Sequence, residues 1–250
     1  MVEIVELSAY CDQLLGSAEL TDYCPNGLQL EGERPIRRLL TGVTASQALI
    51  DAALEWGADA LLVHHGWFWK GESPRLVGMK ARRLRSLVRG GLSLLAYHLP
   101  LDLHPELGNN RQLARVLDVR DPRRTALGDG LVWEGRLRRP IAASELAGTI
   151  ARALGRQPLH LPGRGGLLER VAWCTGAAQG FLDQAANLGV DAYISGEVSE
   201  QTTHLARELG VDYFAAGHHA TERYGVQAVG AHLAERFGLE HRFADIDNPV

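Results

Sequence analysis

The sequence comprises 250 residues, of which 46% are hydrophobic and 22% are charged, so it can bury the core of one large or two small domains. This composition excludes a peptide, a disordered tail and a fibrous repeat. The chain has 26 Lys and Arg residues against 30 Asp and Glu residues, for a net charge of -4, which argues against a protein that holds nucleic acid on a basic surface.

The cysteines and the N-terminus indicate the compartment. Cys11, Cys24 and Cys174 lie far apart and form no C-x-x-C pair, so neither a disulfide framework nor a thiolate zinc site is expected. Residues 1–16 carry acidic side chains where a signal peptide carries basic ones, and no apolar stretch approaches the length of a membrane span. We therefore expect a cytoplasmic protein that does not enter a membrane.

Short apolar runs alternate with helical patterns along the chain, which predicts an α/β fold with a largely parallel sheet. Ser46 is a predicted N-cap and Gly57 a predicted helix stop. The predicted strands cover residues 37–43, 60–63, 92–97 and 131–137. The predicted helices cover residues 47–56, 77–88, 109–117 and 144–154.

Residues 120–130 (RDPRRTALGDG) are rich in turn formers and are the best candidate for a domain boundary. We therefore expect a first α/β lobe over residues 1–125 and a second over residues 126–250.

The chain contains an internal echo that indicates a duplication. Residues 41–66 and 175–197 each read as a strand, a helix closed by Gly, and a strand opened by Asp-Ala, with Asp59 and Asp191 in the same place. A chance recurrence of generic strand-helix-strand patterning is the alternative.

The echo extends to a polar pattern. His98 ends a predicted strand and precedes Asp102 by four residues, and His218 ends a later strand and precedes Glu222 by four residues. This repeated histidine-carboxylate spacing favours two similar α/β lobes that arose by duplication.

These polar residues follow predicted strands, at the carboxyl ends where α/β sheets place their ligands. His64 and His65 are adjacent, so a continuing strand would point them to opposite faces, where they would bind two different ions. The candidate ligands are therefore three imidazoles and two carboxylates: His64, His65, Asp102, His218 and Glu222. Such a nitrogen and oxygen set suits Zn, Mn, Fe or Co, although an isolated histidine is more often a surface or core residue.

Three further residues are candidates for catalytic roles. His98 could be a sixth ligand, a group that orients a ligand, or a proton shuttle, and we favour the last two. Glu197 or Glu200 could be a general base, and a helix N-terminal acid is the alternative for Glu200.

Three other segments could border the site. Residues 22–27 could line the cleft or form an ordinary turn. The aromatic residues 67–69 could stack on a ring, anchor a loop or make a subunit contact. The run 75–89 has six basic and no acidic residues, so it could attract phosphates, although a solvated or inter-subunit helix face is the more ordinary role.

The segments DYCPNGLQLEG, ALLVHHGWFW, AYHLPLDLHPELGNN and GHHATE resemble the Ngg-interacting-factor-three-like proteins, also called the GTP cyclohydrolase I type 2 family. The similarity spans nearly the whole chain in the family's order and fits the short bacterial form without an inserted domain. The resemblance implies two similar α/β lobes with a dinuclear metal site in the cleft between them, bound by the five candidate ligands. It also implies a ring-shaped homohexamer.

Three functional hypotheses follow. The leading one is a hydrolase with two divalent metal ions per subunit that acts on a nucleotide such as GTP or another phosphorylated small molecule. The second is a non-catalytic metal-binding regulatory or adaptor protein. The third, a ring that handles nucleic acid, is disfavoured by the net charge.

Overall fold

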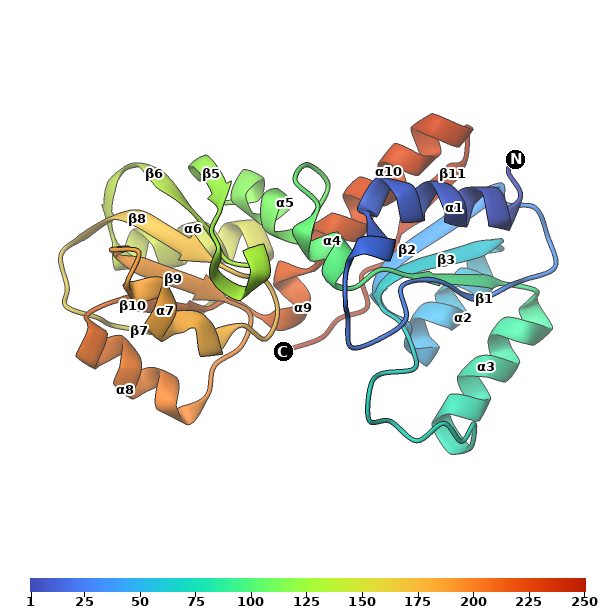
Figure 1. Cartoon of the computed structure of the whole chain (residues 1–250), viewed down its shortest axis with the longest axis horizontal. Helices are drawn as coiled ribbons and strands as arrows, with labels where there is room; N and C mark the ends of the chain where they lie inside the picture. The colour runs from blue at the N-terminus through green and yellow to red at the C-terminus, as the bar shows by residue number, and fades with distance from the viewer. The chain divides into compact units, whose positions relative to one another are not determined.

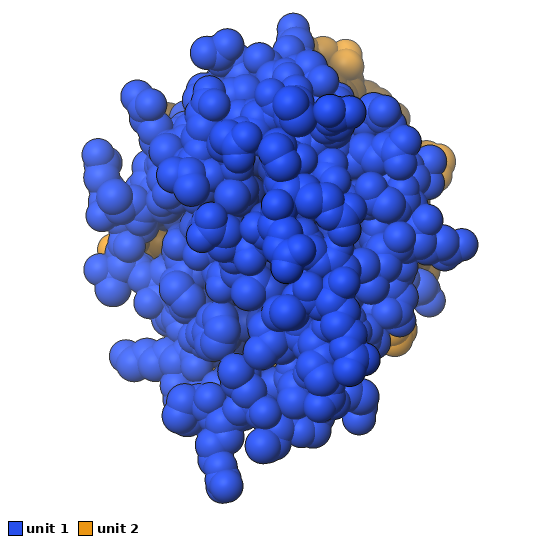
Figure 2. Space-filling view, turned by 90° about the vertical axis from the view of Figure 1, so that its right-hand side faces the viewer, with its two compact units in different colours: residues 1–108, 225–247 blue, residues 109–224, 248–250 orange.

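The computed structural model describes all residues from 1 to 250 and divides into two compact units, coloured separately in Figure 2. Unit 1 comprises residues 1–108 and 225–247, and unit 2 comprises residues 109–224 and 248–250. The first break therefore falls after residue 108, whereas the sequence predicted it after residue 125. Residues 225–247, expected in the second lobe, belong to unit 1. Each unit is an α/β layered structure, as the alternating pattern predicts.

The sheet of unit 1 has five strands in the order β1-β4-β3-β2-β11. Four of them run parallel, and β1 joins the edge of β4 antiparallel. The strands are β1 (Gly27–Leu30), β2 (Arg38–Thr44), β3 (Ala60–His65), β4 (Ser93–Ala96) and β11 (Glu240–Phe243). The predicted strands at residues 37–43, 60–63 and 92–97 are confirmed.

Helices cover both faces of this sheet (Figure 1). The helices packed on one face are α1 (Ile4–Leu15), α4 (Leu99–Leu103) and α10 (Arg223–Phe237), and those on the other are α2 (Gln47–Trp56) and α3 (Gly78–Gly90). A short turn, η1 (Ser17–Glu19), follows α1. Successive residues of β2 enter opposite cores: Leu39 packs in the core with α1 and α10, whereas Leu40 packs in the core with α2.

Local signals set the ends of α2 as predicted. The Ser46 hydroxyl accepts a hydrogen bond from the Leu49 amide, and Gly57 closes the helix in the left-handed region at φ 73°.

The sheet of unit 2 has six strands in the order β5-β6-β8-β9-β10-β7. Its centre, β8-β9-β10, is parallel, and the other strands add antiparallel pairs. The strands are β5 (Arg120–Arg124), β6 (Trp133–Ala142), β7 (Leu159–Leu161), β8 (Leu167–Trp173), β9 (Ala192–Ser195) and β10 (Asp212–Ala215).

Helices also cover both faces of the second sheet. One face carries α5 (Asn109–Val116), α6 (Ala143–Leu154) and α9 (His218–Thr221), and the other carries α7 (Leu182–Ala186) and α8 (Glu200–Leu209). The short turns are η2 (Leu127–Gly130) and η3 (Gln179–Phe181). None of the helices of the chain is both long and apolar enough to cross a bilayer.

The expected turn-rich segment at residues 120–130 contains a strand. β5 pairs with β6 antiparallel at the edge of the sheet, with an irregular register between Arg120 and Arg123. Pro122 removes one backbone donor, which an edge strand tolerates. Tertiary pairing thus overrides local turn preference here.

The two units share an atomic detail that supports the duplication. In unit 1, Asp59 Oδ2 accepts the backbone amides of Arg37 and Arg38 at 2.9 and 3.0 Å. In unit 2, Asp191 Oδ2 accepts the backbone amides of Glu169 and Arg170 on β8, both at 2.9 Å. Each aspartate therefore lies just before one strand and binds the backbone of the neighbouring strand in its own sheet.

The strand registers show that the polar echo is offset by one residue. Ala60 pairs with Ser93 in unit 1, as Ala192 pairs with Asp212 in unit 2. Counting onward from these pairs equates His98 with the glycine before His218. The repeated histidine-carboxylate pattern thus has the same spacing but begins one residue later in unit 2.

Candidate metal centre

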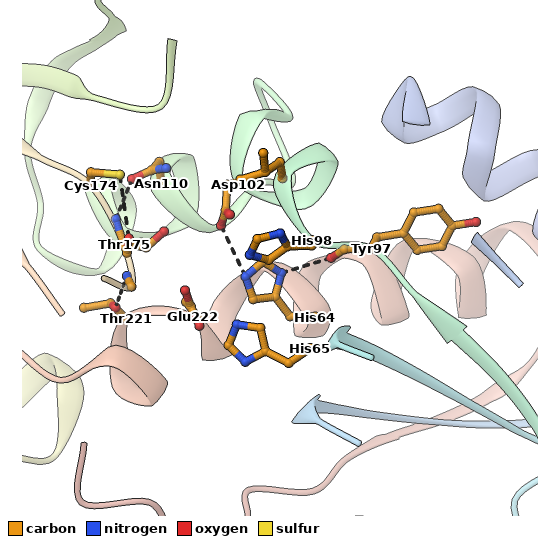
Figure 3. Close-up of polar contacts among 12 residues, drawn as sticks. His64, His65, Tyr97, His98, Asp102, Asn110, Cys174, Thr175, Thr221 and Glu222 are labelled. Atoms are coloured by element: carbon orange, nitrogen blue, oxygen red, sulfur yellow. Dashed lines mark hydrogen bonds and ion pairs between the residues drawn. The ribbon is translucent and has the colours of Figure 1, made fainter. Parts of the chain in front are cut away.

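His64 lies at the end of β3 and is fully buried. Its Nδ1 donates to the carbonyl of Tyr97 at 2.9 Å, and its Nε2 lies 3.6 Å from Oδ1 of Asp102 (Figure 3). Because a carbonyl only accepts hydrogen bonds, the neutral imidazole carries its proton on Nδ1 and presents a lone pair at Nε2.

His65 is the last residue of β3, and its Nδ1 lies 3.1 Å from the hydroxyl oxygen of Thr44, its partner on β2. The ring centroids of His64 and His65 are 4.6 Å apart. The prediction that the two side chains point to opposite faces is therefore wrong. The strand ends at this point, and the two imidazoles have different partners: the carbonyl of Tyr97, just after β4, for His64, and Thr44 on β2 for His65.

His98 follows β4 and is oriented by the segment that precedes β1. Its Nδ1 lies 2.7 Å from Oδ1 of Asp22, and its backbone amide donates to Oδ1 of Asn26 at 2.7 Å. Burial alone would raise the pKa of Asp22, but hydrogen bonds from His98 and Asn26 and the charge of His98 lower it to about 2. Asp22 is therefore an ionised acceptor that fixes the ring of His98.

The donor atoms of unit 1 lie close together. His64, His65 and His98 each offer one ligand atom, and these atoms lie within 4.8 Å of one another. A second group in unit 1, formed by Asp22, Cys24 and His98, meets the same limit. Burial and the charge of Asp22 raise the pKa of Cys24 to about 12, so its thiol stays protonated and is a weak candidate ligand.

Asp102 is placed by α4, a one-turn helix that directly follows His98. Its backbone amide donates to the carbonyl of His98 at 3.3 Å, and its side chain is 8% exposed. The short helix thus brings a buried carboxylate to the imidazole of His64.

In unit 2, His218 lies between two carboxylates. Its Nδ1 is 2.7 Å from Oε1 of Glu197, and its Nε2 is 3.2 Å from Oε2 of Glu222, whose side chain is only 4% exposed. Burial disfavours the imidazolium, but the hydrogen bonds and charges of Glu222 and Glu197 outweigh it and raise the pKa of His218 to about 9. This cluster is therefore an environment that favours positive charge.

A glycine leaves room for the carboxylate of Glu222. Gly176 has a φ of 68°, and a Cβ at this position would lie 2.2 Å from Oε1 of Glu222 and 3.2 Å from Nε2 of His218. A side chain here would displace the two candidate ligands of unit 2.

The residues present fit a divalent metal. Each of the predicted histidine ligands has Nδ1 next to a carbonyl, hydroxyl or carboxylate oxygen, which is how metal-binding histidines are usually oriented. The remaining donors are imidazole nitrogens and carboxylate oxygens, which suit Zn, Mn, Fe or Co better than Ca.

Comparison with known proteins identifies the family. Residues 2–249 match the sequence pattern of Duf34/NIF3 (NGG1p interacting factor 3). The chain belongs to this family. It is 60% identical to the GTP cyclohydrolase 1 type 2 homolog of Allochromatium vinosum, over 100% of this chain and 98% of that protein.

Solved structures agree with the family assignment. The chain superposes on the protein ybgI, described as of unknown function, with a TM-score of 0.95, 50% identity and complete coverage of both chains. It superposes on the protein TTHA1606 from Thermus thermophilus with a TM-score of 0.91, 36% identity and complete coverage of both chains. The resemblance read from the sequence is thereby confirmed.

Sequence reasoning missed the residues that orient the imidazoles. The contacts of Thr44 and the Tyr97 carbonyl carried no signal in the sequence, and Asp22 was expected only to border a cleft. Glu197 was expected to move protons, but its contact with His218 Nδ1 favours an orienting role.

Proposed function

We propose that this chain binds two divalent metal ions per subunit and is a metal-dependent hydrolase. Its ligands are His64, His65 and Asp102 from unit 1, and His218 and Glu222 from unit 2. The observation that carries this proposal is the orientation of the histidines: each ligand imidazole has Nδ1 beside an oxygen of the protein, which leaves Nε2 for the ion.

The bound ions would supply Lewis acidity and lower the pKa of a water molecule toward neutrality. His98 and Glu197 then have different roles. His98 accepts and returns a proton at Nε2, because the Asp22 carboxylate accepts the proton of Nδ1. Glu197 is a positioning residue that holds the ring of His218.

The substrate class follows from the relatives and from the sequence. Close relatives carry the name GTP cyclohydrolase 1 type 2 homolog, which supports a nucleotide or another phosphorylated small molecule as substrate. The homohexameric ring, the cytoplasmic location and the absence of nucleic-acid and membrane partners stay predictions of the sequence.

The test is elemental analysis of protein purified without chelator and without an affinity-tag metal. We expect about two ions per chain in the wild type, the content of a dinuclear site, and a loss of metal in His64→Ala, Asp102→Ala and His218→Ala. His204→Ala is the matched control, because His204 is an exposed imidazole on α8 that pairs with Glu200.

Circular dichroism separates loss of ligand from loss of fold. Full metal content in all three folded ligand variants would overturn the assignment. A dinuclear protein that hydrolyses no nucleotide or phosphate ester in a substrate panel would be a metal-binding regulatory or adaptor protein instead.

A further inference from the structure

Unit 1 contains a pocket of about 290 Å³ between the loop that follows β3 and the start of α3. This volume is near the lower end for small-molecule sites, roughly 300–1,000 Å³. The lining is mostly aromatic and apolar, with three charged side chains. The lining includes Trp67, Phe68, Trp69, Glu72, Lys80 and Arg83.

The wall of the pocket is fixed by hydrogen bonds. The Trp67 indole donates to the carbonyl of Ala45 at 3.1 Å, and the Trp67 amide donates to Oε1 of Gln29 at 2.7 Å. Gln29 Nε2 donates back to the Trp67 carbonyl at 3.2 Å. A pocket whose walls are already held in place binds a ligand without the cost of ordering them.

The next residue is held in a strained conformation. Phe68 has a φ of 70°, in the left-handed region that bulky side chains rarely adopt. Such a conformation is energetically costly and persists only where the surrounding structure enforces it. The contacts of the neighbouring Trp67 help to hold this part of the loop in place.

The charges of the pocket leave one cation uncompensated. Lys80 Nζ lies 2.8 Å from Oε2 of Glu72 and also donates to the carbonyl of Ser73 at 3.1 Å. Arg83 forms no ion pair, and its Nε is buried without a hydrogen-bond partner. A guanidinium that lines a pocket without a carboxylate partner favours the binding of an anion there.

The pocket adjoins the candidate metal ligands of unit 1. Thr44 lines the pocket and also contacts Nδ1 of His65. The Trp69 ring lies 5.8 Å from that of His65 and 4.9 Å from that of His98, measured between centroids. A ligand in the pocket would therefore contact Thr44 and Trp69, the residues that pack against these two imidazoles.

We propose that this pocket binds a planar aromatic ring that bears an anionic group. The ring packs against the indoles of Trp67 and Trp69, and the phosphate or carboxylate pairs with Arg83. Identifying this ligand as the substrate rests on the proposed hydrolase function. The pocket itself lies wholly within unit 1 and contains no candidate metal ligand.

Isothermal titration calorimetry tests the chemistry of the ligand with four probes. Guanosine 5′-monophosphate and nicotinate combine a ring with an anion, guanosine has the ring alone, and ribose 5-phosphate has the anion alone. We expect at least one of the first two to bind tenfold or more tightly than both single-feature probes. Binding of the phosphate but not of the carboxylate, or the reverse, identifies the anion.

Variants of the arginine locate the binding. Arg83→Met should weaken binding of the ring-anion probe by about tenfold or more, or about 1.4 kcal/mol, and Arg83→Lys should restore part of it. Arg82→Met is the matched control, because Arg82 is an exposed neighbour on α3 that does not line the pocket. Equal binding by Arg83→Met and the wild type, or no binding of any probe, overturns the proposal.

The experiment is run on both chelator-treated and metal-loaded protein. Arg83-dependent binding in a chain that takes up no metal would leave the pocket standing while the proposed function fails. If the wild type binds none of the probes but still holds about two ions per chain, the content expected of a dinuclear site, the pocket proposal fails while the metal-binding proposal stands.

Discussion

Replacing Asp22 by Asn tests whether this carboxylate fixes the tautomer of His98. The Asp22 side chain is 2% exposed. Its Oδ1 accepts from His98 Nδ1 and the Tyr23 amide, and its Oδ2 accepts from the Leu99 amide and the Asn26 side chain. An asparagine has only one oxygen, so its NH2 group must face one of these two pairs of donors.

The choice between the two pairs is decided by chemistry. The Leu99 amide can only donate, whereas an imidazole can change tautomer and the Tyr23 amide lies on the exposed side, where water can accept its proton. The new NH2 group should therefore face His98 and donate to Nδ1. The proton of His98 then moves to Nε2, the nitrogen that is proposed to accept a proton from the reaction.

The effect on stability can be worked from the pKa of Asp22, which falls from 3.8 to about 2 in the folded chain. A shift of this size corresponds to about 2 kcal/mol of unfolding free energy. Because the folded pKa is the lower one, this stabilisation is present above about pH 4 and disappears as the pH falls through about 2. Asp22→Asn should therefore be less stable by about 2 kcal/mol at pH 7 and by about half of that near pH 3.

Urea unfolding of chelator-treated protein at the two pH values measures the stability difference, and nitrogen-15 NMR of the imidazoles reports the tautomer. Asp51→Asn is the control: Asp51 is an exposed carboxylate on α2, so its loss should change stability by less than about 0.5 kcal/mol. A His98 that keeps its proton on Nδ1, or an Asp22→Asn variant that is no less stable than the control, would contradict this role of Asp22.

Three further substitutions probe the candidate metal site and the sheet of unit 1. Thr44→Val removes the hydroxyl beside Nδ1 of His65 and should lower metal affinity by roughly 10–100-fold in a chelator competition; unchanged affinity would remove this imidazole from the ligand set. Gly176→Ala should displace Glu222 and reduce metal content while circular dichroism stays unchanged; full metal content would contradict this. Asp59→Ala leaves two backbone amides without their acceptor and should lower the free energy of unfolding in urea by about 1–3 kcal/mol. An unchanged free energy of unfolding would mean that water replaces the carboxylate.

The elements set by local signals were predictable from the sequence. Ser46 and Gly57 bound α2 through a side-chain cap and a left-handed glycine, and both signals depend only on residues within the helix and at its ends. β5 and β11 were not predicted, because each is a short edge strand stabilised by a partner strand elsewhere in the chain. Burial against a sheet, which the local pattern does not record, decides their conformation.

The same distinction applies to the candidate site. His64 and His65 could be singled out because a histidine pair at the end of an apolar strand is visible in a few residues of sequence. The roles of Asp22 and Thr44 could not, since they contact imidazoles 76 and 21 residues away. Which nitrogen of each histidine faces the metal is therefore information that only the folded chain contains.

A duplication would account for the matching sheets of the two units, but not for the candidate ligands. Asp59 and Asp191 have the same role in the two units, and the strand registers that start from them equate Asp102 with Thr221. Thr221 is buried and accepts a hydrogen bond from the Gly176 amide, so this position braces the backbone in unit 2 and offers a carboxylate in unit 1. The two units thus share the aspartate hydrogen bonds within their sheets and differ at the strand ends, where a metal site requires donors that the sheets themselves do not.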